Sequence, residues 1–456
     1  MTVAVSQGAA AARRHIAFTA TLAALAGLMF GLDVGVIGGA QQFIQHEFKL
    51  DNDAIGWIVS SMALGATVGA ALAGWLSATM GRKRTLIASA GLFVLGALFC
   101  GFAWTADVLA LARIVLGLAI GIAAFTAPLY LAEIAPEDKR GAMISTYQLM
   151  ITIGIFVAFL SDTAFSYIES WRWMLGIIAV PGALFLIGVL GLPESPRWLV
   201  LRGRHDDASA VLHKLRGDDA VARREVADIE AQLRTPQHGL RLFLQNRNFR
   251  RSVGLGIALQ IAQQLTGINV VMYYAPKIFE NMGYSTATQM WFTAIVGVTN
   301  MLATFVAIGL VDRWGRKPIL YTGCTMMALG LGLTGAYMNT EPLVAVAMTL
   351  VFVVGFAMSA GPLVWTLCSE IQPLKGRDFG IGVSTVTNWL ATFVVTGTFP
   401  ILFSQIGHAN TFWLYAAFNA AFLLFTWVLV PETKGITLEQ IERRLMDGKP
   451  LRDIGR

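Results

Sequence analysis

The chain of 456 residues is 55% hydrophobic and only 14% charged, whereas soluble domains carry about 25% charged residues. This composition excludes an ordinary soluble protein and predicts a polytopic membrane protein. Lys and Arg, which give the net charge of +6, cluster in a few connections and at the two ends without a base-reading motif, so no nucleic-acid partner is expected. The three cysteines lie in apolar runs without metal-ligand spacing, so neither a disulfide framework nor a metal site is expected.

Twelve apolar segments follow one another along the chain and predict an all-α membrane protein, because each is about 20 residues or longer. They begin near residues 16, 54, 85, 108, 142, 173, 252, 289, 319, 342, 379 and 411. Basic residues concentrate in the connections after the second, fourth, eighth and tenth segments, as in Arg82-Lys83-Arg84. By the positive-inside rule this pattern places both termini in the cytoplasm.

The first apolar run, residues 16–40, contains one charged residue, Asp33. An aspartate at the centre of a membrane helix costs roughly 2.5 to 3.5 kcal/mol on the most lenient scales, so a function is expected for it. Arg113 is the only other charge that the sequence places well inside a span, and at about 1.5 Å per residue both residues lie at a similar depth. A proton-carrying role for Asp33 is predicted, with a fixed ion pair between the two spans as the alternative.

A polar segment separates the twelve spans into two groups of six. The predicted organisation is an N-terminal half at residues 1–192, a cytoplasmic helical linker at 193–251, a C-terminal half at 252–431 and a cytoplasmic tail at 432–456. Within the linker, helices are expected at His205–Arg216 and Asp219–Leu233. In the tail, Thr437 and Gln440 have the spacing of a helix capping box.

The two halves repeat the same motifs at a nearly constant distance, which indicates an internal duplication. The repeated motifs are Gly81-Arg82-Lys83 with Gly315-Arg316-Lys317, Glu133 and Arg140 with Glu370 and Arg377, and Pro193-Glu194-Ser195 with Pro431-Glu432-Thr433. Two six-helix halves of the same orientation are therefore predicted, with a substrate site between them near the midplane of the membrane.

The same offset aligns Asp33 with Asn269, so one half has a carboxylate where the other has an amide. In the seventh span, helical spacing places Gln260, Gln263 and Gln264 on one face together with Gly267. Asn269 lies off this face in a regular helix, but Gly267 permits local unwinding, as in the broken helices that line transporter cavities. The amides can bind the hydroxyl groups of a ligand, or they can bond neighbouring helices to one another.

Further polar and aromatic residues within the spans extend this pattern to both halves. They are Gln148 in the fifth span, Asn300 in the eighth, Trp365 after Gly361-Pro362 in the tenth and Asn388 in the eleventh. Proline interrupts the helical hydrogen bonds and allows the tenth span to bend towards a cavity. Several amides with an aromatic surface are suited to a neutral polyol that has apolar ring faces.

The repeated charged motifs lie at the predicted cytoplasmic ends of the spans. They consist of Arg82, Glu133 and Arg140 in the first half and of Arg316, Glu370 and Arg377 in the second. Simple surface charge is one interpretation. Their duplication favours another, a cytoplasmic latch of salt bridges that holds the two halves together while the substrate cavity opens outward, because such bridges are individually weak and can break.

With these residues in view, nearly the whole chain resembles the sugar-porter branch of the major facilitator superfamily. The matching motifs are Pro193-Glu-Ser-Pro-Arg-Trp198, Gln263-Gln-Leu-Thr-Gly-Ile-Asn269, Asp312-Arg-Trp-Gly-Arg-Lys317, Gly361-Pro-Leu-Val-Trp365 and Pro431-Glu-Thr433. Within that family, Tyr147-Gln-Leu-Met-Ile-Thr152, Leu160-Ser-Asp-Thr-Ala-Phe165 and Cys368-Ser-Glu-Ile-Gln-Pro-Leu-Lys375 are similar to segments of the bacterial galactose-proton and arabinose-proton symporters.

The resemblance implies a role for each matching position. Asp33 and Arg113 would couple transport to protons, and Asp312 and Arg313 would join the latch of the second half. The sugar contacts would come from Gln148, Gln263, Gln264, Asn269, Asn300, Trp365 and Asn388. One departure is Ala78, which stands where the family has an acidic residue before Gly-Arg-Lys and cannot make the corresponding contact.

These features predict a proton-driven importer of a monosaccharide, most similar to galactose carriers, in a bacterial inner membrane. The proton is the expected coupling ion, no cofactor is expected, and the family is typically monomeric. A pentose symporter is one alternative, because the same amides could bind the hydroxyls of several sugars. A facilitative uniporter and a sugar-sensing receptor are others, because they would share the sugar site without needing Asp33. An enzyme is not expected, since the sequence has no nucleophile motif, metal-ligand cluster or phosphate-binding glycine loop.

Overall fold

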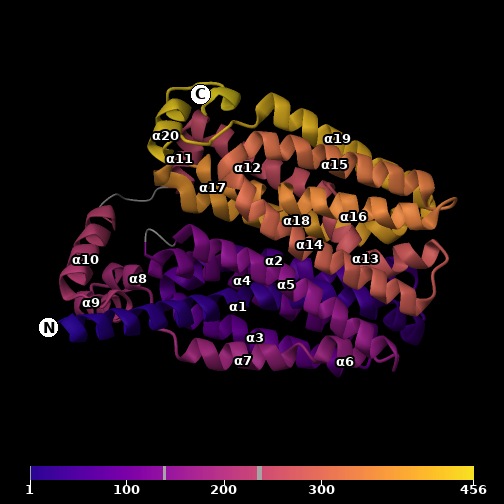
Figure 1. The fold of residues 1–456 in the computed structure, drawn as a ribbon, viewed down its shortest axis with the longest axis horizontal. Coiled ribbons are helices and arrows are strands. Elements are labelled where there is room, and N and C mark those ends of the chain that lie inside the picture. Colours follow the sequence, from indigo (N-terminus) through magenta and orange to yellow (C-terminus); the bar gives the residue numbers. More distant parts are fainter. Residues whose placement is uncertain (1, 137–139, 234–238, 456) are drawn as a thin grey trace.

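The computed structural model describes residues 2–136, 140–233 and 239–455, although the side chains of residues 2–15, 140–142, 144, 232 and 311–312 also lie outside the description. Within these ranges, the regular elements are all helices. Twelve helical segments of the described chain are long and apolar enough to cross a membrane, which confirms the predicted all-α membrane fold. Figure 1 shows two helical bundles side by side, with both ends of the chain at the same end of the molecule, here called the termini side.

The first bundle contains six of the twelve spans. They are α1 (Thr2–Phe48), α2 (Asn52–Met80), α3 (Arg82–Gly101), α4 (Ala106–Ile134), α5 (Arg140–Ser166), and α6 (Trp171–Gly176) together with α7 (Ala179–Leu190). Asp51 and Thr105 begin α2 and α4 as N-caps, since their side chains accept backbone N–H groups of the first turn. Helix α1 packs mainly against α5, and α2 against α4.

The second bundle contains the other six spans. They are α12 (Arg247–Leu265) with α13 (Ile268–Asn281), α14 (Thr286–Trp314), α15 (Arg316–Tyr337), α16 (Pro342–Met358) with α17 (Ala360–Glu370), the short η2 (Leu374–Gly376) with α18 (Arg377–Gln405), and α19 (His408–Leu429). All twelve spans begin within a few residues of the predicted positions, because long apolar runs define them clearly.

Two spans of the second bundle are broken, and the sequence predicted both breaks. Gly267 separates α12 from α13 with φ of 89°, a left-handed conformation that glycine adopts without steric cost. Ser359 separates α16 from α17 three residues before Pro362. Both breaks redirect the chain in the interior of the bundle, because Ser359 and Thr266 are fully buried.

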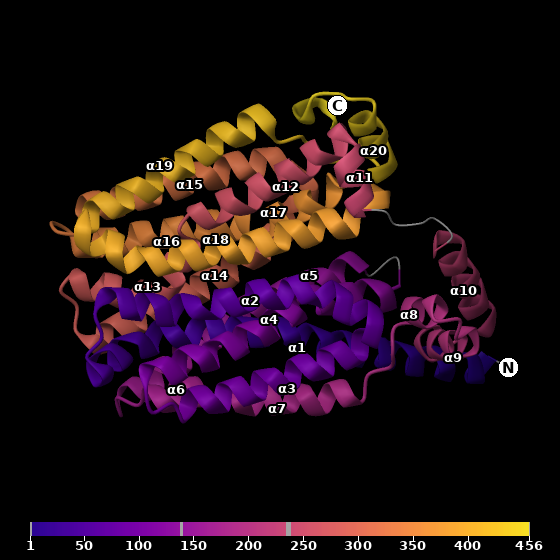
Figure 2. The same cartoon turned by 180° about the vertical axis from the view of Figure 1, so that it is seen from behind.

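Short helices cover the termini side, as Figure 2 shows from behind. Along the chain, the segment that joins the two bundles forms α8 (Pro196–Leu201), α9 (His205–Arg216), α10 (Asp219–Leu233) and α11 (Gly239–Gln245), and the tail forms α20 (Leu438–Met446) and η3 (Leu451–Asp453). Helices α9 and α10 have the bounds that the sequence predicted. The Thr437 hydroxyl accepts the N–H of Gln440, which confirms Thr437 as the N-cap of α20.

Glycines allow the helices of each bundle to approach closely. A Cβ atom on Gly117 of α4 would lie 1.9 Å from the carbonyl oxygen of Met62 on α2, and one on Gly31 of α1 would lie 2.0 Å from that of Ile151 on α5. Such distances are impossible for a real Cβ, so any side chain would push the helices apart. Small residues at helix interfaces provide much of the packing in membranes, where the lipid gives no hydrophobic drive between helices.

We therefore expect Gly117→Ala to destabilise the first bundle by about 1 to 3 kcal/mol, the usual cost of overpacking. Gly91→Ala is the matched control, because a Cβ on this helical glycine would meet nothing within 4 Å. Thermal unfolding in detergent should show a lower midpoint for Gly117→Ala and an unchanged or slightly higher midpoint for Gly91→Ala. Equal midpoints for the two variants would contradict this account of the α2–α4 contact.

Candidate substrate and proton site

Asp33 of α1 and Arg113 of α4 meet in the interior of the first bundle, as their depths predicted. Arg113 Nη1 lies 3.7 Å from Asp33 Oδ1, and both side chains are completely buried. The pair is too long for a hydrogen bond, and neither Asp33 oxygen accepts one from any described residue. Asp33 is thus attracted by a nearby positive charge but is not fixed by it.

Arg113 is held from the other side by the backbone of α2. Its Nε donates to the carbonyl oxygen of Ile58 at 3.0 Å and its Nη2 to that of Val59 at 3.4 Å. The guanidinium therefore keeps its position through partners other than Asp33. A change in the protonation of Asp33 can alter the electrostatic balance of the site without removing all support of Arg113.

The amides of the second bundle form one connected network. Asn388 of α18 donates to Gln260 Oε1 at 2.6 Å and to Gln263 Oε1 at 2.9 Å. Asn269 donates to Gln264 Oε1 at 2.6 Å, and Gln264 donates to Gln263 Oε1 at 3.4 Å. The break at Gly267 brings Asn269 to this face although a regular helix would turn it away.

This network is anchored to the second broken span. Gln263 Nε2 donates to the carbonyl oxygens of Ala360 at 2.8 Å and Gly361 at 3.3 Å. These carbonyls lie in the first turn of α17, next to the break at Ser359. The two helix breaks and the amides of three helices thus converge at one place.

The other predicted contact residues have mixed environments. Asn300 of α14 is buried, Gln148 of α5 is half-buried, and Trp365 of α17 is 37% exposed. Trp389, next to Asn388, is buried and lies 5.2 Å from the ring of Phe30 on α1. An aromatic contact therefore joins the two bundles directly beside the amide network.

A cavity of about 1880 Å³ opens between the bundles on the termini side. Its walls include Ala70 and Arg82 of the first bundle, Arg377 and Thr387 of the second and Glu225 of the linker. Ala70 and Thr387 each lie ten residues from the helix end on this side, a depth of about 15 Å or half of a membrane core. The cavity thus reaches the residue that precedes Asn388.

The two bundles are in contact on the opposite side. Gln41 of α1 donates to the carbonyl oxygen of Tyr273 on α13 at 2.8 Å, and Thr163 of α5 donates to that of Met290 on α14 at 3.3 Å. Helices α2 and α18 also pack closely there, since Gly56 leaves no room for a Cβ beside the carbonyl of Gly397. Among the described residues, the cavity therefore opens on the termini side, and the bundles are joined on the other.

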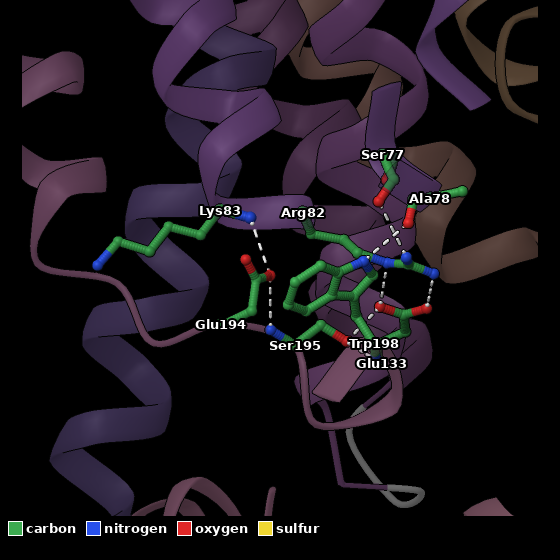
Figure 3. A network of polar contacts seen from close by, with 8 residues as sticks. All are labelled: Ser77, Ala78, Arg82, Lys83, Glu133, Glu194, Ser195 and Trp198. Carbon is green, nitrogen blue, oxygen red and sulfur yellow. Dashed lines mark hydrogen bonds and ion pairs between the residues drawn. The ribbon is translucent and has the colours of Figure 1, made fainter. Parts of the chain in front are cut away.

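On the termini side, the charged motif of the first bundle forms the network in Figure 3. Arg82 makes a bidentate ion pair with Glu133, with both N–O distances 2.8 Å. Glu133 also accepts the hydroxyl of Ser195, and Glu194 accepts the backbone N–H groups of Lys83 and Ser195. The glycine turn before α3 is thus fixed to the segment that follows α7.

The second bundle repeats this arrangement. Arg316 pairs with Glu370 at 2.8 Å, Thr433 donates to Glu370, and Glu432 accepts the N–H groups of Arg316 and Lys317. Sequence repetition revealed the motif containing Glu194 and Glu432 but not their function. They bind the backbone of the duplicated Gly-Arg-Lys turns, which residue spacing alone does not show.

The residues predicted to form the latch differ in their partners and in their exposure. Glu370 binds Arg316, while Arg377 donates to the backbone carbonyl of Gln372 at 3.4 Å. Arg313 is exposed, and the side chains of Arg140 and Asp312 lie outside the described residues. Both ion pairs seen here join helices of the same bundle. A latch between the bundles in an outward-open conformation stays a prediction.

The backbone of Ala78, at the end of α2, is bound by side chains of α8 and of the residue after it. Its carbonyl oxygen accepts the indole N–H of Trp198 at 2.9 Å, and Arg202 donates to the carbonyl of Thr79 at 2.8 Å. Figure 3 shows Trp198 beside the end of α2. Helix α8 therefore satisfies the last carbonyls of α2 through its side chains.

The prediction that Asp33 and Arg113 are the only charges well inside the spans is incomplete. Asp162 of α5 is also buried, with an exposed fraction of 1%. It lies four residues before the end of its helix, where counting along the sequence suggests contact with water. Contact with α1 buries Asp162 instead. In the sequence, the one feature that could have indicated this burial is the position of Asp162 in an apolar run.

Comparisons with known proteins identify the family of the chain. The sequence model of the family described as "Sugar (and other) transporter" matches residues 19–445. The chain is 58% identical over 445 residues to the galactose-proton symporter of Escherichia coli (strain K12), covering 96% of each chain. It is 52% identical over 453 residues to the arabinose-proton symporter of the same strain, covering 97% of this chain and 96% of the relative.

Among solved structures, the chain is similar to the xylose transporter XylE from E. coli in a partially occluded inward open conformation. The TM-score is 0.83 at 31% identity, and the match covers 93% of this chain and 100% of the other. The chain belongs to the sugar transporter family of the major facilitator superfamily. It is therefore a multi-pass membrane transporter and not an enzyme.

We expect Glu133→Gln to destabilise the protein by roughly 3 kcal/mol, because a mostly buried arginine loses its charged partner. The exposed fractions of the two side chains are 9% for Arg82 and 5% for Glu133. Glu47→Gln is the matched control, since Glu47 and Arg172 are 43% and 40% exposed and an exposed pair contributes below about 1 kcal/mol. Thermal unfolding should separate the variants; a larger loss for Glu47→Gln would contradict this ranking.

Proposed function

We propose that the protein is a proton-coupled monosaccharide importer of a bacterial inner membrane that works by alternating access. The observation that carries this proposal is the placement of a buried, unbonded carboxylate, Asp33, in one bundle and of a buried amide network in the other. A carboxylate that is not fixed by hydrogen bonds is suited to exchange a proton, and amides are suited to bind sugar hydroxyls. The names of the similar symporters support the same function.

The termini side corresponds to the cytoplasm in this proposal, as the distribution of Lys and Arg predicts. The conformation is then inward-open, because the cavity leads from that side to the residue before Asn388. The polar contacts of Gln41 and Thr163 keep the outer side closed. The protein acts as a monomer, and the proton is its coupling ion.

The transport cycle requires both ligands to shift one equilibrium between two conformations. In the outward-open state, protonated Asp33 and sugar bound by the amides together permit the outer side to close. Opening to the cytoplasm then releases the sugar. The charge of Arg113, 3.7 Å away, favours the ionised form of Asp33 and so promotes release of the proton on the same side.

Galactose is the substrate that we propose, because the galactose-proton symporter is 58% identical to this chain. The arabinose-proton symporter is 52% identical, so a pentose is the second candidate. Facilitated uniport without protons is the alternative mechanism. The buried carboxylate at position 33 argues against it, since uniport does not need a charge inside the first span.

Asp33→Asn tests the coupling. The amide keeps the size of the side chain but cannot exchange a proton, so uphill accumulation of labelled galactose in vesicles should be abolished. Exchange of labelled for unlabelled sugar should continue, because it does not require net proton movement. Retained accumulation would show that Asp33 does not carry the proton, whereas loss of exchange as well would show a general loss of the fold or of sugar binding.

Gln264→Ala tests the sugar site. The substitution removes an amide that accepts from Asn269 and donates to Gln263, and loss of such contacts should raise the dissociation constant about tenfold or more. Competition of galactose, glucose, arabinose and xylose against labelled galactose measures affinity and specificity together. Gln289→Ala is the control, because Gln289 is buried near the outer end and bonds only Tyr284 among described side-chain contacts. Unchanged affinity in Gln264→Ala would remove this amide from the site.

A further inference from the structure

A second intramembrane carboxylate, Asp162 on α5, has no part in the transport cycle described so far. Its Oδ2 accepts the backbone N–H of Gly39 on α1 at 3.0 Å, while its Oδ1 has no hydrogen-bond partner among the described residues. The exposed fraction of Asp162 is only 1%. A polar group so deeply buried and only half satisfied calls for an explanation.

Gly39 is what makes room for this carboxyl group. A Cβ atom at Gly39 would lie 2.4 Å from Asp162 Oδ2 and 2.5 Å from its Cβ, so the Asp162 side chain fills the space beside the glycine. Gly39 follows Asp33 by six residues on α1. Asp162 therefore lies about 9 Å further towards the outer side than Asp33.

Asp162 is buried in the contact of α5 with α1, and the residues next to it in the chain contact the second bundle. The neighbouring Thr163 donates to the carbonyl of Met290 on α14, and Gly38, next to Gly39, faces the carbonyls of Met272 and Tyr273 on α13. Gln41, one turn away, donates to Tyr273. We call these contacts of Gly38, Gln41 and Thr163 with α13 and α14 the outer closure. Separation of the bundles on this side would therefore expose to water the residues next to Asp162 and Gly39.

No described cation pairs with Asp162 in the closed state. On the helices around it, Asp33 faces Arg113, Glu47 of α1 binds Arg172 of α6, and Lys277 of α13 binds Glu280. Helix α14 has no charged residue between Thr286 and Leu310. An ionised carboxylate with one hydrogen bond in such surroundings is costly, so the neutral, protonated form of Asp162 is favoured while the outer side is closed.

We propose that Asp162 is a second proton-binding site, which takes up a proton from the outer side when the outer closure forms and releases it to the same side when the closure opens. The step is a simple protonation, in which a proton from external water forms an O–H bond with the carboxylate. This inference rests on the alternating access of the proposed function. It adds that external acidity itself favours closure, and that alkaline conditions favour the outward-open state.

The test uses a cysteine at Met290, whose side chain is buried in this conformation. We would measure its alkylation by a membrane-impermeant maleimide in right-side-out vesicles, in an Asp33→Asn background that removes the first proton site. Rates are divided by those of Asn339→Cys, an exposed outer-loop position, which corrects for the pH dependence of the thiol. The three native cysteines are buried, and the parent chain without the new cysteine controls for them.

Between about pH 5.5 and about pH 8.5 we expect the normalised rate to rise several-fold, because ionised Asp162 stabilises the open outer side. Adding Asp162→Asn, which keeps an acceptor for the N–H of Gly39, should leave the rate low and independent of pH. The same rise with Asp162→Asn, or a flat profile while Asp162 is present, would overturn the proposal.

Two further measurements keep the outcome clear. Sugar exchange in the same vesicles shows that the Asp162→Asn chain is folded, and Asp162→Ser, smaller and equally unable to titrate, replaces it if that chain is not inserted. Because the alkylation assay needs no sugar accumulation, a negative result concerns Asp162 alone. Failure of the proposed function would appear separately, as accumulation that survives Asp33→Asn.

Discussion

The ion pair between Asp33 and Arg113 sets the main constraint on this protein, because two charges are held where neither water nor lipid headgroups can solvate them. Such a pair persists only if the surrounding chain provides partners, and α2 provides them for Arg113 through the carbonyls of Ile58 and Val59. Asp33 receives no comparable support. The arginine is thus a fixed positive charge, and the carboxylate beside it is the partner whose state can change.

The second bundle meets the same constraint with neutral groups. Its amides satisfy one another across α12, α13 and α18, so few of their donors and acceptors are left unpaired. A sugar bound at this network, as we propose, would exchange these bonds for its own, which favours a ligand whose hydroxyls match several donors and acceptors at once. The duplicated halves thus differ at equivalent positions, with a carboxylate at Asp33 and an amide at Asn269, which we propose serve the proton and the sugar respectively.

The sequence predicted the features that depend on local patterns. Apolar runs defined the twelve spans, repeated motifs defined the two halves, and Gly267 marked the helix break that brings Asn269 to Gln264. Matching depth predicted the meeting of Asp33 and Arg113, but other features that depend on packing between distant segments were not predicted. The repeated motifs contain Glu370, Arg316 and Arg377 but do not show that Arg316 is the residue that pairs with Glu370. Likewise, nothing near Asp162 in the sequence indicates that Gly39 buries it.

The central claim is that sugar and proton cross the membrane together, and sugar-driven proton movement measures this directly. The purified protein would be reconstituted in lightly buffered liposomes without a pre-formed pH gradient, and galactose would be added outside. The account predicts a rise of external pH when galactose is added, which a protonophore abolishes. Galactose uptake that leaves the external pH unchanged would contradict proton coupling and would identify the protein as a uniporter.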